Sequence, residues 1–163
     1  MIAGARQRTA DATAILVGGG WLGAAVLVGA VVAPAAFAVL PSRTLAGALV
    51  GRVLPALFYW GIATGIALAA LARGRRSGRW VTTSTVAGLV TAISCGAAQL
   101  VVAPRIERVR ASIPGTVEEL PRGDARRAEF GRLHGASVLW LGVGTIGAAL
   151  SVAGAFVRVR REP

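Results

Sequence analysis

The sequence of 163 residues contains no lysine and only one cysteine, one histidine and one methionine. A lone cysteine, Cys95, excludes an internal disulfide and a cysteine metal cluster. With no second histidine, and with Met1 as the only methionine, we expect neither paired axial haem ligation nor an ordinary copper site within one chain. The sequence also lacks a Ser-His-Asp arrangement, a phosphate-binding loop and paired carboxylates. We therefore expect no enzyme activity, no catalytic residue, no bound metal and no cofactor.

Charged residues are absent from four long apolar runs, at positions 14–40, 53–72, 80–104 and 135–157. Each run has at least 20 residues, about the length that a helix needs to cross a bilayer. Continuous apolar runs favour membrane helices over the alternating strands of a membrane barrel. The mean hydropathy of +0.65 agrees with this interpretation. We predict an all-α membrane protein, a four-transmembrane-helix bundle forming one integral membrane domain, with residues 105–134 as a polar outer segment.

The formal net charge of +11 arises from 18 arginines, most of which flank the apolar runs. A soluble nucleic-acid module would place such charge on one face, so we expect the lipid bilayer, not nucleic acid, as partner. Four arginines lie within Arg73–Arg79, which predicts that this loop and both termini are cytoplasmic. The predicted location is the inner (plasma) membrane. The first run is longer than a signal-peptide core, so we expect it to be retained as a helix.

Several short sequences occur twice. Val31-Val32-Ala33-Pro34 recurs 70 residues later as Val101-Val102-Ala103-Pro104, and Gly51-Arg52 recurs 80 residues later as Gly131-Arg132. A fixed offset of this kind predicts a duplicated two-helix unit, so the bundle would consist of two parallel two-helix repeats. The two prolines predict a kink or a helix end at the membrane surface.

The repeat places four of its signature residues at the outer end of the bundle, together with the only histidine. The candidate binding rim consists of Pro34, Arg52, Pro104, Arg132 and His134. Arginines near helix ends can bind an anionic ligand at such a mouth. The alternative is that the arginines extend to lipid headgroups while the prolines end helices.

The third run contains the most polar membrane-embedded residues, Gln99, Ser94 and Thr91. Such side chains form hydrogen bonds between helices or line a cavity. Glycines four residues apart, as at Gly61 and Gly65, predict close helix approach; the other such pairs are Gly19 with Gly23, Gly47 with Gly51, and Gly131 with Gly135.

Helix-capping signals lie outside the apolar runs. Thr116 and Glu119 fit a capping box, while Asp124 and Ser42 are candidate N-caps. The pattern after Asp124 predicts a helix that continues into the fourth span.

Four sequences carry a family resemblance: Trp21-Leu22-Gly23, Val32-Ala33-Pro34-Ala35-Ala36-Phe37, Gly51-Arg52-Val53-Leu54-Pro55 and Phe130-Gly131-Arg132-Leu133-His134-Gly135-Ala136-Ser137. The chain resembles a bacterial family of four-helix membrane proteins of unknown function, related to eukaryotic transmembrane protein 205. That family has an Asn shortly after the Ser, where this chain has Val138-Leu139-Trp140.

The resemblance and the residues together favour a structural or small-solute-handling membrane component, for which a homo-oligomer is one expected state and no substrate is identified. The alternative function is that of a redox- or metal-associated membrane protein using His134. It rests on a distant similarity of the family to copper-resistance and haem-pathway membrane proteins.

Overall fold

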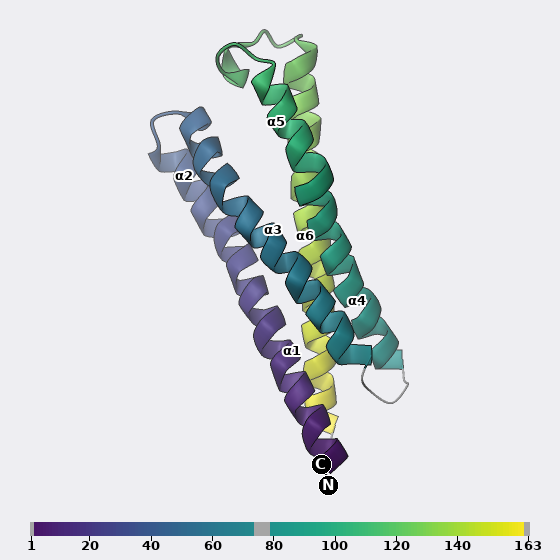
Figure 1. Cartoon of the computed structure of the whole chain (residues 1–163). Helices are drawn as coiled ribbons and strands as arrows, with labels where there is room; N and C mark the ends of the chain where they lie inside the picture. Colours follow the sequence, from purple (N-terminus) through teal and green to yellow (C-terminus); the bar gives the residue numbers. More distant parts are fainter. Residues whose placement is uncertain (1, 74–78, 162–163) are drawn as a thin grey trace.

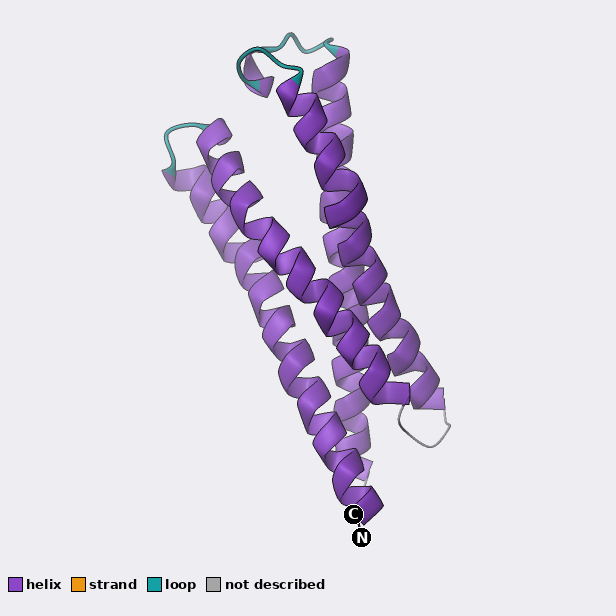
Figure 2. Ribbon diagram, viewed as in Figure 1, coloured by secondary structure: helices purple, strands orange, loops and turns teal. Residues whose placement is uncertain are grey.

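The computed structural model describes residues 2–73 and 79–161, and these residues form helices joined by short connections (Figure 2). The elements are α1 (Ile2–Val26), η1 (Leu27–Val32), α2 (Ala33–Val39), α3 (Arg43–Arg73), α4 (Arg79–Gly96), η2 (Ala97–Val102), α5 (Ala103–Ala111), η3 (Val117–Glu119) and α6 (Ala125–Arg161). Four helical runs are long and apolar enough to cross a membrane. The prediction of an all-α four-helix bundle is confirmed. The helices extend beyond the apolar runs at most ends.

The four runs are antiparallel to their chain neighbours, so both termini lie at one end of the bundle (Figure 1). We call this the termini end; the opposite end, which holds the α2–α3 and α5–α6 connections, is the loop end. An even number of crossings places both termini on the same side of a membrane. Most of the arginine-rich loop from which the cytoplasmic side was predicted, positions 74–78, lies outside the described residues.

Neither proline ends its helix, so of the two predicted outcomes, a kink or a helix end, the helix end is wrong. A π-helical segment precedes each proline, and the helical run continues to Val39 or Ala111. Before the prolines, the N–H of Ala33 bonds the carbonyl of Val28, and the N–H of Ala103 bonds that of Ala98. Proline donates no N–H and its ring crowds the carbonyl four residues earlier, and the wider π turn accommodates this.

The predicted caps are confirmed. The Ser42 hydroxyl accepts a hydrogen bond from the Leu45 N–H at 3.2 Å, and Asp124 Oδ1 accepts one from the Arg126 N–H at 2.8 Å. Thr116 and Glu119 form a capping box around η3. These side chains satisfy donors that the first turn of a helix leaves without intrahelical partners.

The tightest helix contact joins α3 and α4. A Cβ atom added at Gly65 would lie 2.6 Å from the carbonyl oxygen of Gly88, and one at Gly88 would lie 2.7 Å from the backbone nitrogen of Ala69. Gly61 likewise leaves no room for a Cβ beside Trp21 and Cys95. Close approach at Gly61 and Gly65 is therefore confirmed. The other predicted glycine pairs face open space or, at Gly47 and Gly51, a side chain of the loop end.

The core follows from these contacts. Trp21 is fully buried and donates its indole N–H to the carbonyl of Leu57 at 2.9 Å. Cys95 and Ala98 pack beside it from the third span, and Ala148 from the fourth. A buried tryptophan needs such a partner for its N–H, so this bond fixes the depth of α1 against α3.

Candidate functional site

The loop end is joined across the bundle mainly by Arg110 of α5. Its guanidinium lies near Gly47 and Gly51 of α3, with Nη2 3.5 Å and Nη1 3.8 Å from the Cβ positions that would be added there. The same guanidinium lies over the ring of Phe130 in α6, 5.4 Å from its centroid. One arginine thus contacts both helical hairpins, and its side chain stays 35% exposed.

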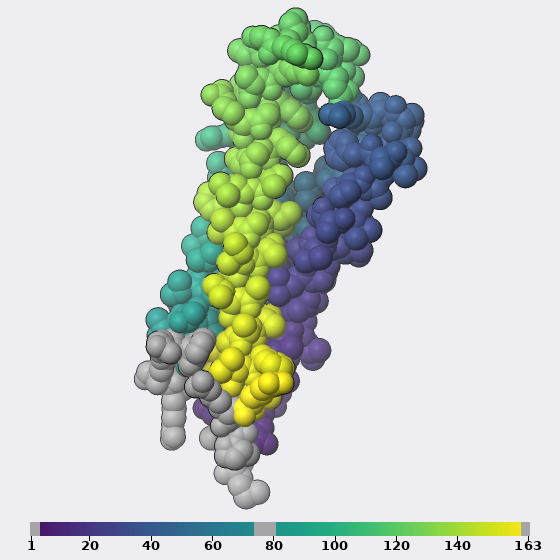
Figure 3. All heavy atoms as spheres, turned by 180° about the vertical axis from the view of Figure 1, so that it is seen from behind, coloured from purple at the N-terminus to yellow at the C-terminus, as the bar shows by residue number. Residues whose placement is uncertain are grey.

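The two hairpins lie close together at the termini end and diverge toward the loop end (Figure 1). Seen from behind, α6 runs along α1 near the termini, while the surface is indented between the loop ends of the two hairpins (Figure 3). A second polar contact spans this opening, because the Thr44 hydroxyl donates to Glu118 Oε2 at 3.2 Å. Glycines allow close helix contacts toward the termini end, whereas polar side chains connect the two hairpins at the loop end.

The five residues of the predicted rim are all exposed at or near the loop end. Pro34 and Pro104 lie in the first turns of α2 and α5, on different hairpins. The His134 ring is parallel to that of Phe130, with centroids 6.3 Å apart. No described hydrogen bond or ion pair joins the rim residues to one another.

Sequence reasoning missed Arg110, which lies where the rim was expected. The available signal was its position three residues after Glu107 at the end of the third span, where the two form a 3.4 Å ion pair. Its contact with Phe130 depends on the α5–α6 connection, which sequence spacing does not define.

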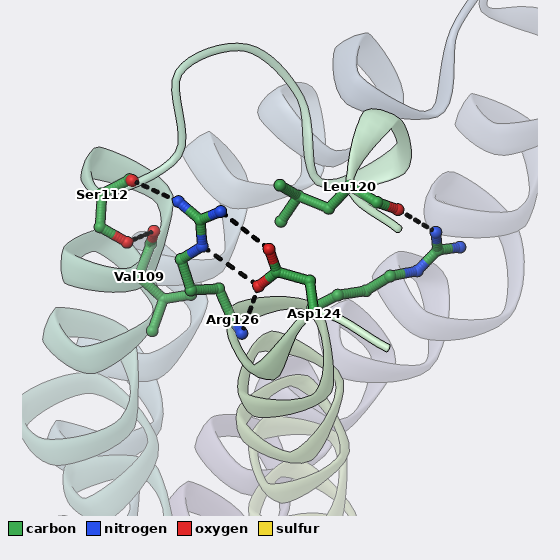
Figure 4. Close-up of polar contacts among 6 residues, drawn as sticks. Val109, Ser112, Leu120, Asp124 and Arg126 are labelled. Atoms are coloured by element: carbon green, nitrogen blue, oxygen red, sulfur yellow. Dashed lines mark hydrogen bonds and ion pairs between the residues drawn. The ribbon is translucent and has the colours of Figure 1, made fainter. Parts of the chain in front are cut away.

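A bidentate pair orders the α5–α6 connection (Figure 4). Arg126 donates from Nε to Asp124 Oδ1 at 3.1 Å and from Nη2 to Oδ2 at 2.8 Å, and its Nη1 bonds the carbonyl of Ser112. The side-chain hydrogen bond from Arg126 lowers the pKa of Asp124 to about 2. Arg127 adds a bond to the carbonyl of Leu120 at 2.7 Å. These bonds hold the connection above the start of α6.

The predicted membrane-embedded polar residues have different environments. Thr91 is fully buried and its hydroxyl contacts the carbonyls of Ala87 and Gly144. It therefore joins α4 to α6, as expected for a hydroxyl between membrane helices. Ser94 is buried beside Gly144. Gln99 lies in η2, and its buried Oε1 has no hydrogen-bond partner among the described residues.

A buried charged cluster at the termini end was not predicted. Asp11 of α1 is 1% exposed, and its Oδ1 accepts a hydrogen bond from Arg158 Nε of α6 at 3.1 Å. Arg158 Nη1 also donates to the Ser84 hydroxyl of α4 at 2.8 Å. Buried charges in membrane proteins are costly unless paired, and they commonly mark functional positions. The sequence signal was an acid shortly before the first span and an arginine just after the last.

The arrangement supports no metal centre in the described part of the chain. No group of three or more His, Cys, Asp or Glu side chains is close enough to hold a metal ion there. His134 has an aromatic neighbour rather than a second ligand. The chemistry available at the loop end is the binding of anionic groups by guanidinium and imidazole donors.

Comparison with known proteins identifies a family. No curated protein and no solved structure matches the chain. A family model described as a domain of unknown function, DUF4149, matches residues 16–114. The match covers the first three spans and ends before α6, which carries Phe130 to Ser137. The chain therefore belongs to this family of proteins with a domain of unknown function, and its helices make it a multi-pass integral membrane protein by length and composition.

Proposed function

We propose that the protein is a small-solute-handling component of the plasma membrane. Its loop end faces outward and binds a small anion or the phosphate of a lipid headgroup. The observation that carries this proposal is the partly exposed Arg110 guanidinium, held between two diverging hairpins by Gly47, Gly51 and Phe130. An arginine positioned in this way offers several donors to a phosphate or carboxylate at little cost in conformational freedom.

Charge at the loop end supports the same function. Residues 41–60 and 105–134 contain nine arginines and five acidic residues. Within the described chain, Arg110 and Arg126 form ion pairs with Glu107 and Asp124. Arg52 and Arg132 have no such partner there and add to the positive potential around Arg110. Clefts lined by charge of one sign raise the local concentration of the opposite ion.

The proposal includes a duplicated architecture, with both termini cytoplasmic. The π-helical segments Leu27–Val32 and Ala97–Val102 are 70 residues apart, the offset of the repeated Val-Val-Ala-Pro. Gly18 and Gly88 share this offset, and neither leaves room for a Cβ: Gly18 is crowded by Val152 of α6 and Gly88 by Ala69 of α3. The first helix of each unit thus packs on the second helix of the other, as a pseudo-twofold axis requires. Bacterial origin and kinship with transmembrane protein 205 belong to this proposal.

Binding measurements test the proposal. Purified protein in neutral detergent is titrated with phosphatidylglycerol, followed by native mass spectrometry, and with inorganic phosphate, followed by calorimetry. Losing charge-assisted hydrogen bonds of about 1.5–3 kcal/mol should weaken binding in Arg110→Gln by about tenfold to 100-fold. Arg6→Gln, which changes an exposed arginine at the termini end, is the matched control and should bind as wild type does.

The two titrations distinguish the sources of the anionic group. Binding of phosphatidylglycerol alone identifies a lipid headgroup, and binding of phosphate alone identifies a free solute. Equal affinity of Arg110→Gln and wild type for both ligands would refute the proposal. We also propose that the protein forms a homo-oligomer, and the same mass spectra measure its oligomeric state.

The alternative redox or metal-associated function requires His134 to act with ligands from elsewhere. An oligomer could bring several His134 side chains together, because the residue is exposed. Metal analysis and visible absorption of freshly purified protein test this alternative. Absence of metal and haem would refute it, and we propose no enzymatic activity for the isolated chain.

A further inference from the structure

We propose that Asp11, Ser84 and Arg158 form a termini-end latch, which keeps the bundle closed at the termini end while the loop end is open. This inference deepens the proposed function, since a mouth that receives solute at one end requires closure at the other. The cluster joins three helices, α1, α4 and α6, through the bonds of Arg158 to Asp11 at 3.1 Å and to Ser84 at 2.8 Å. Asp11 is 1% and Ser84 2% exposed.

The ion pair of the latch, Asp11 with Arg158, joins helices of the two hairpins. The pairs of Arg110 with Glu107 and of Arg126 with Asp124 are local in the chain, three and two residues apart. Asp11 and Arg158 are 147 positions apart, and removal of one partner would leave the other as an uncompensated charge in a low-dielectric environment, which is costly. Separation of α1 from α6 at this end requires that pair to break.

Behind the latch, the buried residues of α4 and α6 are all small. The buried residues of α4 from Ser84 to Cys95 are Ser, Ala, Gly, Thr, Ser and Cys; those of α6 from Gly144 to Ala155 are Gly, Gly, Ala, Ser, Gly and Ala. Hydroxyls join the two helices along this seam, from Ser151 to the Ser84 carbonyl and from Thr91 to the Gly144 carbonyl. Such small residues allow close packing, and they leave little on this hairpin to block access to Cys95 once α1 parts from α6.

The helix segments at which the two hairpins would bend lie toward the loop end. The π-helical segments η1 and η2 occupy matching places in the first and third spans, and each ends two residues before a proline. Helices bend most readily at prolines and π-helical turns. Movement at these two segments would shift the loop ends of the hairpins, with the latch setting the position of the termini end.

Cys95 provides the test, because it is the only thiol in the chain and lies fully buried between Gly61 and Gly144. Proteoliposomes are treated with the impermeant anionic reagent sulfonatoethyl methanethiosulfonate on the termini side or on the loop side, and modification is measured by intact mass. Protease access to a C-terminal tag identifies the orientation. We expect negligible modification of wild type from the termini side and at least tenfold faster modification of Asp11→Asn from that side.

Further variants keep the result interpretable. The charge exchange Asp11→Arg with Arg158→Asp should restore slow modification. Ser84→Ala keeps the ion pair but removes the bond from Arg158 to α4, and it should raise the rate severalfold. It replaces Asp11→Asn if that variant does not fold. Thr44→Ala breaks a bond at the loop end only and should leave termini-side modification as in wild type.

A wild-type rate in folded Asp11→Asn and Ser84→Ala would overturn the latch, and so would an equal rise from both sides, which indicates general loosening. These outcomes are separate from anion binding by Arg110. The latch can fail while Arg110→Gln still loses affinity, and anion binding can fail while Cys95 still responds to Asp11→Asn.

Discussion

Replacing Gly65 with alanine tests the packing of α3 against α4. The new Cβ would lie 2.6 Å from the Gly88 carbonyl oxygen, and ordinary contact begins at 3.4 Å, so the two helices must part by at least about 0.8 Å (3.4 − 2.6). The Ala92 backbone nitrogen is closer still, and backbone atoms cannot rotate away. Overpacking of this kind costs about 1–3 kcal/mol, occasionally more, and alanine regains about 1 kcal/mol of helix propensity. Because the new Cβ meets backbone atoms, we expect a cost near the upper end of that range and a net loss of about 2 kcal/mol in the free energy of unfolding.

Unfolding in mixed micelles of increasing SDS content measures this change, with the reaction of Cys95 with a thiol-sensitive dye as the signal. A loss of about 2 kcal/mol lowers the folded-to-unfolded ratio about 30-fold. Gly23→Ala is the matched control, because a Cβ there meets no atom within 4 Å. It should be neutral or stabilised by up to about 1 kcal/mol. A Gly65→Ala variant as stable as wild type, or an equal loss in Gly23→Ala, would refute the close approach.

Two further predictions concern single hydrogen bonds. Trp21→Phe removes the indole donor to the Leu57 carbonyl and should lower the free energy of unfolding by about 1–2 kcal/mol. The control Trp60→Phe, at a position 47% exposed, should change the free energy of unfolding little. The same SDS titration compares the two variants, and equal effects would contradict the hydrogen bond of Trp21. The pKa of Asp124 in the folded protein, about 2, lies below its ordinary value. The stability that the Asp124 carboxylate gives to the start of α6 is therefore fully present above about pH 4 and is lost as pH falls through about 2. Amide exchange at Arg126, corrected for intrinsic rates, should accelerate over that range in wild type and not in Asp124→Asn, and a flat wild-type profile would exclude this linkage.

The sequence predicted the helices and their caps correctly, because each depends on residues that are close together in the chain. The apolar runs identified four helices, and Thr116 with Glu119 identified a cap, since each depends on length or short-range hydrogen bonding. The π-helical segments were missed because a proline in a membrane helix permits a helix end, a kink or a wider turn, and the sequence does not choose among them.

Long-range partners could not be read in the same way. Four-residue glycine spacing identifies a helix face but not its neighbour, so Gly61 and Gly65 meet another helix while Gly19 and Gly23 do not. The partnership of Asp11 with Arg158 depends on the relative depth and rotation of the first and last helices. Neither follows from one sequence.

The most direct test of a bundle open at the loop end and closed at the termini end uses single cysteines in a Cys95→Ala background. Gly47→Cys lies beside Arg110, and Ala14→Cys lies at a 5% exposed position near the latch. We predict that an impermeant anionic thiol reagent on the loop side modifies Gly47→Cys, more slowly when phosphatidylglycerol or phosphate is bound, and that Ala14→Cys resists modification from either side. Modification of Ala14→Cys from the termini side, or a Gly47→Cys rate that no anion changes, would contradict the account.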